Sequence, residues 1–151
     1  MTIYADASVI VATVSRQRNS RLVDPLVRDP WQLLIVSDFA LAESAAALAK
    51  LGRVERWSTQ QADNLFQELD AWAALLTEHV AIESSDVALA IRFVRVPQLS
   101  LRAPDAIHIA AAHRLGATLL TLDHGMARAA AALGVPYLNP AEGLAPGEPK
   151  D

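Results

Sequence analysis

Four acidic residues of this chain lie within strongly apolar stretches, an unusual place for a carboxylate. They are Asp6, Glu43, Asp105 and Asp123. We expect none of them to have a cationic partner at helical spacing. An unpaired carboxylate that leaves water is costly, so such groups are normally paired, protonated or bound to a metal. If the four acids meet at one point, they repel one another until a divalent cation is bound. The sequence therefore predicts a metal site.

Each acid also has an ordinary structural explanation. Asp6 and Asp105 stand near predicted helix starts, where aspartate caps the helix and complements its dipole. Glu43 would be a solvated residue on an exposed alanine face. Asp123 would end a strand and begin a turn toward Gly125. From the residues alone, the metal site and these separate structural roles both stay open.

The acids are carried by short apolar strands that alternate with helices. Strands are predicted at 3–5, 33–36, 118–122 and 135–138, and helices at 9–19, 38–51, 59–78, 86–96, 104–115 and 125–133. This alternation predicts a parallel sheet with both faces covered. Ligands of such sheets bind at the carboxyl ends of the strands. Because Asp6 and Asp123 each close a strand, we expect both at that edge.

Capping residues mark several of the predicted helix ends. Ser8 is the expected N-cap of the first helix, and Ser37 or Asp38 that of the second. Ser58 and Gln61 form a predicted capping box before the long amphipathic helix. Gly52 is expected just past the end of the second helix.

Length and composition place the chain among small, single-domain proteins. Its 151 residues suit one domain, predicted at 1–138 and followed by a flexible C-terminal tail at 139–151. The absence of cysteine excludes disulfides and thiolate metal sites. No segment is apolar for long enough to span a membrane, and the N-terminus lacks the pattern of a signal peptide. We therefore expect a cytoplasmic protein. The net charge of −4 argues mildly against broad, non-specific binding of nucleic acid.

Four sequence blocks occur in a recognisable order between residues 2 and 140. They are Tyr4-Ala5-Asp6-Ala7-Ser8, then Glu43 in the helix after the second strand, then Leu101-Arg102-Ala103-Pro104-Asp105-Ala106-Ile107-His108-Ile109-Ala110, and finally Leu120-Thr121-Leu122-Asp123 with Ala129-Ala130 and Leu133-Gly134-Val135 behind it. In this order and spacing they resemble the PIN-domain ribonucleases, and most closely the VapC-type toxins of bacterial toxin–antitoxin pairs.

The resemblance implies a three-layer α/β/α fold with a short-stranded, mainly parallel sheet. It also implies dependence on Mg²⁺ or Mn²⁺, endonucleolytic cleavage of RNA, a cognate VapB-type antitoxin and a homodimer. Hard divalent cations held by carboxylates suit phosphodiester hydrolysis, because they activate water and stabilise developing charge. By the same analogy, the products carry 5′-phosphate and 3′-hydroxyl ends.

The resemblance also implies roles for individual residues. Asp6 becomes the central metal ligand, and Glu43 and Asp105 complete the set. Asp123 holds a second metal or an ordered, metal-bound water. Ser8 and Thr121 are expected to orient these carboxylates through hydrogen bonds.

Arg102 and a group of N-terminal arginines are candidates for contact with RNA. For Arg102, phosphate binding and an ordinary solvated position are equally supported. For Arg16, Arg18 and Arg21 the solvated interpretation is preferred.

The histidines have less distinct roles. His108 follows Asp105 by three residues, and a histidine packed and hydrogen-bonded beside the core is favoured over a ligand or general base. His124 keeps the same alternatives. His79 and His113 are expected at the surface.

Two other functions compete with a toxin nuclease. One is a PIN fold kept only for protein binding, and the other is a PIN nuclease that processes RNA outside a toxin–antitoxin pair. A receiver-like signalling domain is discounted because neither Lys50 nor Lys150 stands at the end of a late strand. The chain has neither a G-x-G-x-x-G motif nor a Walker-type loop, which argues against a nucleotide-binding enzyme.

Overall fold

The structure is a computed structural model that describes residues 1–143. The strands are β1 (Thr2–Ala5), β2 (Leu33–Ser37), β3 (Glu78–Val80), β4 (Thr118–Leu120) and β5 (Tyr137–Leu138). The helices are α1 (Ala7–Ser15), α2 (Ser20–Val27), α3 (Asp38–Val54), α4 (Thr59–Leu76), α5 (Ser84–Val94), α6 (Ala103–Arg114) and α7 (His124–Ala132), with a short 3₁₀ helix η1 (Pro97–Leu99) before α6.

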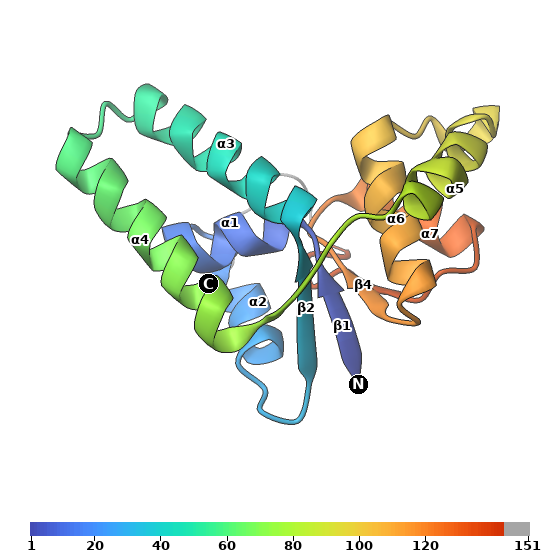
Figure 1. Ribbon diagram of the computed structural model, residues 1–151, viewed down its shortest axis with the longest axis horizontal. Helices are drawn as coiled ribbons and strands as arrows, with labels where there is room; N and C mark the ends of the chain where they lie inside the picture. Colours follow the sequence, from blue (N-terminus) through green and yellow to red (C-terminus); the bar gives the residue numbers. More distant parts are fainter. Residues whose placement is uncertain (144–151) are drawn as a thin grey trace.

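All five strands run parallel in the order β3-β2-β1-β4-β5. Ile3 on β1 pairs with Leu34 on β2 and with Thr118 on β4. Helices cover both faces of this sheet (Figure 1), so the predicted three-layer α/β/α fold is confirmed. The chain first winds from β1 to β2 and β3 and then crosses back to β4 on the other side of β1. The carboxyl ends of β1 and β4 therefore lie at the topological switch point, where parallel sheets bind ligands.

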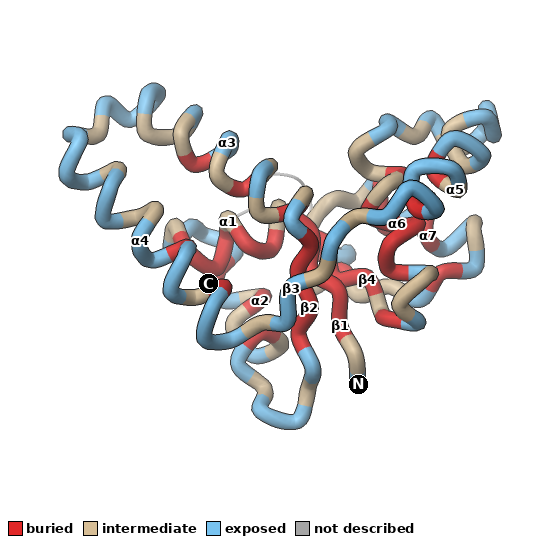
Figure 2. The backbone as a smooth tube through the Cα atoms, viewed as in Figure 1, coloured by how far each residue is buried: buried red, intermediate tan, exposed pale blue. Residues whose placement is uncertain are grey.

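The central strands are buried on both faces, and their side chains alternate between two cores. Ile3 and Ala5 pack on the side of α1 to α4, whereas Tyr4 packs on the side of α6 and α7. The same alternation separates Val36 from Ile35 on β2. Figure 2 shows this continuous buried band along β1, β2 and β4. A parallel sheet covered on both faces requires such near-continuous apolar strands.

Helices α3 and α4 form a long hairpin that projects from the sheet (Figure 1). Ser58 and Gln61 make the predicted capping box at the start of α4. The predicted end of α3 before Gly52 was wrong, because the helix continues to Val54. A Cβ at Gly52 would lie 2.8 Å from Cε3 of Trp57, so glycine here makes room for the indole ring instead of ending the helix.

At the N-terminal helices, two predictions were wrong and one helix was missed. Asp6, not Ser8, is the N-cap of α1, since its side chain accepts from the backbone N–H of Val9. The helix ends at Ser15 and not at residue 19, because Arg16 adopts a left-handed conformation with φ of 51°. The separate helix α2 was not predicted.

Strand β3 was also missed by the sequence analysis. It is three residues long, lies at the edge of the sheet and carries exposed side chains at Glu78 and His79. Such a segment has no apolar periodicity from which a strand can be read. The predicted helix at 59–78 accordingly ends earlier, at Leu76.

The C-terminal boundary of the domain stays a prediction. Residues 139–143 are described, and Asn139 Oδ1 accepts a hydrogen bond of 2.9 Å from the backbone N–H of Ala141. The rest of the predicted tail, residues 144–151, lies outside the described part. Among the helices of residues 1–143, none combines the length and the apolar character that crossing a bilayer demands.

Candidate active site

Asp6 stands at the centre of the candidate site, between the end of β1 and the start of α1. Its side chain is 2 % exposed and accepts three hydrogen bonds. The hydroxyls of Ser8 and Thr121 each donate at 2.6 Å, one to each carboxylate oxygen, and the N–H of Val9 donates at 3.2 Å. Both oxygens of this carboxylate are therefore fixed in orientation.

Burial raises the pKa of Asp6 above its ordinary value. The hydrogen bonds from Ser8 and Thr121 and the charge of His108 act in the opposite direction, but burial outweighs them. A carboxylate in this position is destabilised by the loss of water, and a nearby cation would favour its charged form. The surroundings of Asp6 thus favour the binding of a positive ion.

The same two hydroxyls connect Asp6 to the segment that carries Asp123. Ser8 Oγ accepts from the backbone N–H of Leu122 at 2.9 Å, and Thr121 Oγ1 accepts from that of Asp123 at 3.0 Å. Asp123 is the N-cap of α7, with Oδ1 accepting from the N–H of Met126 at 2.7 Å. Its second oxygen has no such bond in the described part of the chain, so Asp123 combines its capping role with a free ligand atom.

Replacing Thr121 with valine tests this hydroxyl connection. We expect cleavage activity or divalent-ion affinity to fall about 10- to 100-fold, because groups that orient ligands typically have effects of this size. The matched control is Thr13→Val, since Thr13 is also buried but donates at 2.8 Å to the carbonyl of Val9 within α1. Calorimetric titration with Mn²⁺ measures the affinity; equal affinities of the two variants would contradict the role given to Thr121.

Glu43 is held by a chain of hydrogen bonds that crosses the sheet. Its Oε1 is hydrogen-bonded to His108 Nε2, and His108 Nδ1 is 2.8 Å from the hydroxyl of Tyr4. That hydroxyl is in turn 2.7 Å from Ser37 Oγ, which caps α3 by accepting from Ala40. Both ring nitrogens of His108 are thus engaged, Nδ1 by Tyr4 and Nε2 by Glu43. The chain therefore fixes the orientation of the imidazole ring and the position of Glu43.

His108 was predicted to be packed and hydrogen-bonded beside the core, and this is confirmed by its 1 % exposure. The prediction did not anticipate that one of its partners would be Glu43. Burial raises the pKa of Tyr4, with the hydrogen bond from Ser37 acting against it and the charges of Asp6 and Glu43 adding to it. Tyr4 thus stays a neutral hydroxyl donor. His79 and His113 are exposed as predicted.

Asp105 has a cationic partner, which corrects the expectation that none of the four acids would have one at helical spacing. Arg102 lies three residues earlier, and its Nε donates to Asp105 Oδ2 at 3.1 Å. The Arg102 side chain is 74 % exposed, so this ion pair is weak and easily exchanged. Asp105 raises the pKa of Arg102, and the charges of Asp123 and Glu43 add to this effect. The negative charges of three carboxylates therefore all act on the guanidinium of Arg102.

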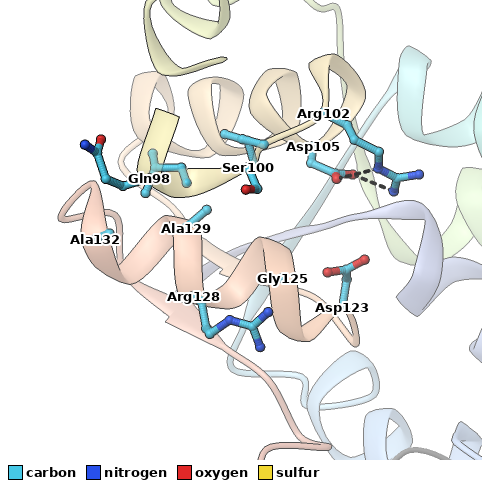
Figure 3. A pocket seen from close by; sticks show the side chains of 11 residues that line it. Gln98, Ser100, Arg102, Asp105, Asp123, Gly125, Arg128, Ala129 and Ala132 are labelled. Carbon is cyan, nitrogen blue, oxygen red and sulfur yellow. Dashed lines mark hydrogen bonds and ion pairs between the residues drawn. The ribbon is translucent and has the colours of Figure 1, made fainter. Parts of the chain in front are cut away.

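Asp105 and Asp123 line the same pocket, between α6 and α7 (Figure 3). Within residues 1–143, no three His, Asp or Glu side chains are gathered closely enough to ligate an ion as they stand. The residues nevertheless fit a divalent cation in ligand type, since all four donors are carboxylates. They also fit in charge. Burial disfavours the charged form of Asp6, which a nearby cation would favour. The negative charges of Asp105, Asp123 and Glu43 all stabilise the positive charge of Arg102.

Three residues of the candidate site were not predicted to belong to it: Tyr4, Ser37 and Arg128. Tyr4 and Ser37 were assigned only to a strand and a helix cap, although a hydroxyl on a buried strand and another at a strand's carboxyl end are signals of a polar site. Arg128, which lines the same pocket as Asp105 and Asp123, lies five residues beyond Asp123 and shares no helical face with it. His124 Nδ1 lies 3.3 Å from Asn139 Nδ2. Within residues 1–143, His124 is not part of the hydrogen-bond chain that joins Glu43, His108 and Tyr4.

Comparison with protein families gives a match over most of the chain. The model of the family described as the PIN domain matches residues 3–132. The comparison with curated protein sequences gives no match.

Several solved structures share the fold at low sequence identity. FitAcB from Neisseria gonorrhoeae has a TM-score of 0.69 and 21 % identity, covering 93 % of this chain and 99 % of that one. VapBC2 from Rickettsia felis, bound to a DNA fragment of its promoter, has a TM-score of 0.67 and 15 % identity over 92 % and 98 % of the two chains. VapC20 from Mycobacterium tuberculosis, described as a toxin that cleaves the sarcin–ricin loop, has a TM-score of 0.64 and 17 % identity over 84 % and 94 %. At these identities, the likeness concerns the fold.

Proposed function

Since this chain belongs to the PIN domain family, we propose that it is a metal-dependent endoribonuclease toxin held in check by a cognate antitoxin. The observation that carries this proposal is the setting of Asp6 at the switch point of the sheet. It is buried, fixed by two hydroxyls and surrounded by the elements that carry the other three acids. Likeness of fold to toxin–antitoxin structures supports the toxin assignment.

We expect Asp6, Glu43, Asp105 and Asp123 to hold Mg²⁺ or Mn²⁺. Such an ion supplies an activated water and stabilises charge on the phosphate during hydrolysis. Ser8 and Thr121 keep both oxygens of Asp6 in place, and His108 does the same for Glu43. Held in this way, the ligands need little reorganisation when the ion and the substrate bind.

Arg102 has two uses in this proposal. Paired with Asp105, it neutralises one of the carboxylates. If Asp105 were to ligate a divalent ion, the exposed guanidinium would be free to bind a phosphate oxygen of the RNA, for which its planar fork is well suited. Arg102 would thus exchange a carboxylate for a phosphate as the substrate enters.

The remaining assignments are proposals suggested by the resemblance to the family. We propose a VapB-type antitoxin as partner, a homodimer as the assembly and the cytoplasm as the location. By analogy with the family, the expected products carry 5′-phosphate and 3′-hydroxyl ends, which requires water to displace the 3′-oxygen.

Induced expression in a bacterial host tests the proposed function. The wild-type protein should arrest growth and produce discrete RNA fragments, whereas Asp6→Ala at the same soluble level should do neither. Equal RNA damage by both proteins would contradict the proposal. Cleavage by the wild type in vitro without growth arrest would favour a nuclease of RNA processing over a toxin.

A further inference from the structure

A pocket of about 450 Å³ opens beside Asp105 and Asp123, between η1 and α7. Its volume lies in the range of roughly 300–1,000 Å³ typical of small-ligand sites. One wall comes from residues 98–102 and the other from the exposed face of α7 (Figure 3). The pocket therefore extends from Asp105 and Asp123 along η1 and α7 and offers room for a group that adjoins the reacting phosphate.

Two arginines, Arg102 and Arg128, line this pocket, and Arg128 carries the inference. Within residues 1–143 its guanidinium has no hydrogen-bond or ion-pair partner, and the residue is exposed. In Figure 3 its side chain runs along α7 in the direction of Asp123. Arg102 is paired with Asp105, whereas Arg128 can bind a ligand without first breaking an ion pair. A free guanidinium beside an anionic site is suited to an oxyanion with several acceptor oxygens.

Gly125 keeps the space between Arg128 and Asp123 open. A Cβ at this position would lie 3.1 Å from Asp123 Oδ1 and 3.9 Å from Arg128 Nη2. The carboxylate and the guanidinium thus flank a single glycine, without a side chain between them. A ligand anion can reach Arg128 while a neighbouring group faces Asp123.

The remaining lining is mixed in character. Figure 3 shows the hydroxyl of Ser100 pointing from η1 toward α7, and in the described part of the chain it has no hydrogen-bond partner. Leu99 and Ala129 contribute apolar surface, and Gln98 contributes an amide. A nucleotide has the matching parts, with an anionic phosphate, a ribose rich in hydroxyls and a base with an apolar face.

We infer that this pocket binds the nucleotide next to the scissile phosphate, with Arg128 contacting the flanking phosphate. The inference rests on the proposed nuclease function. An acidic segment of a protein partner is the competing occupant. RNA is favoured because the pocket is continuous with two of the carboxylates that would act on the phosphodiester.

Arg128→Gln tests the inference, with Arg21→Gln as the matched control. Arg21 is also exposed and without a partner in the described residues, but it lies on α2. For cleavage of a fluorescein-labelled single-stranded RNA, we expect Arg128→Gln to raise KM about 3- to 10-fold with little change in kcat. RNA affinity measured by fluorescence anisotropy should fall by the same factor. In a plot of the logarithm of RNA affinity against the logarithm of salt concentration, the slope should become shallower by about 0.7. This is the value for one phosphate contact on a single strand.

A second pair of variants changes the opposite wall of the pocket. Gln98→Glu places a negative charge there with almost no change of shape, and Gln67→Glu makes the same change on the exposed face of α4. Only the first should raise KM, because it repels the RNA.

The possible failures are distinguishable. If Arg128→Gln and Gln98→Glu keep the wild-type KM while the wild type cleaves RNA, the pocket assignment is overturned and the nuclease remains. If those variants keep the KM but lose a partner protein, the pocket binds an acidic peptide and the inference is likewise overturned. If the wild type cleaves no RNA, the proposed function itself fails.

Discussion

Replacing Asp6 with asparagine is expected to lower the rate of RNA cleavage by about 10²- to 10³-fold. The substitution preserves the size of the side chain and an oxygen for the N–H of Val9. It removes the charge that we expect to hold the metal ion. Charge stabilisation by a bound ion is worth several kcal/mol, and each 1.36 kcal/mol corresponds to a factor of ten in rate. Single-turnover kinetics with Mg²⁺ measures the effect.

The same variant should be more stable than the wild type when divalent ions are removed by EDTA. We expect the free energy of unfolding at pH 7 to rise by about 1–3 kcal/mol, because a buried charge without an ion pair is replaced by a neutral amide. Chemical denaturation gives this value. Ser44→Ala provides the control, since Ser44 is buried but its hydroxyl donates to the backbone carbonyl of Ala40 and not to Asp6. A variant that is inactive and also less stable would indicate that Asp6 acts mainly as a helix cap.

The raised pKa of Asp6 gives a pH dependence of known sign. Its carboxylate holds a proton more tightly in the folded protein than in the unfolded chain, where its pKa has the ordinary value of 3.8. In the window between 3.8 and the raised value the folded state binds more protons, so its stability increases as the pH falls. Asp6→Asn should abolish this increase, which thermal unfolding in EDTA across that window would show.

The largest effect on stability is expected from Arg114→Ala. Arg114 donates at 2.8 and 2.9 Å to the two oxygens of Asp86, whose side chain is 1 % exposed, and it also reaches the carbonyl of Ala81. This ion pair joins α5 to α6. Its removal leaves a buried carboxylate without a cationic partner, and breaking a buried ion pair in this way typically costs about 3–5 kcal/mol. Urea denaturation should show a loss of this size.

Two comparisons make this prediction specific. Arg92→Ala removes an exposed arginine from α5 and should change stability by no more than about 0.5 kcal/mol. The double variant Asp86→Leu with Arg114→Leu should lose less than Arg114→Ala alone, because no charge is left unpaired. If Arg114→Ala had no larger effect than Arg92→Ala, the ion pair would have no structural importance.

Asp86 also has a pH dependence, opposite in sign to that of Asp6. Burial acts to raise its pKa, but hydrogen bonds from Arg114 and from the N–H of Glu83 outweigh burial and lower the pKa. Its contribution to stability is complete above the ordinary value of 3.8 and is lost as the pH falls from there through the lowered value. As the pH falls below that ordinary value, the protein should therefore lose stability. In Arg114→Ala this dependence of stability on pH should be weaker.

The fold could be predicted from the sequence where apolar residues form unmistakable runs. The strands at β1, β2 and β4 and the capping box at Ser58 follow from local patterns, and parallel pairing follows from their alternation with helices. Helix α2 could not be found in this way, because it contains Pro25 and depends on the left-handed turn at Arg16. Gly52 shows the same limit, since the ring of Trp57, which it accommodates, cannot be inferred from spacing.

The candidate site was predictable in its residue types but not in its contacts. The acids stand out because they interrupt apolar segments, and the switch point brings two of them to one edge. Glu43 and His108 are 65 residues apart, and Tyr4 and His108 are 104 apart. Such pairs depend on the packing of α3 and α6 on opposite sides of the sheet. Arg102 was interpreted as a phosphate contact or as a solvated residue, although its spacing from Asp105 already allowed the ion pair.

The most direct test of the account is the rate of RNA cleavage by the purified protein as a function of Mg²⁺ or Mn²⁺ concentration. We predict no cleavage in EDTA, saturable activation by either ion, and the loss of this activation in Asp6→Asn, Glu43→Gln, Asp105→Asn and Asp123→Asn. A rate that is independent of divalent ions, or that survives in all four variants, would contradict the assignment of these carboxylates to a metal-dependent nuclease site.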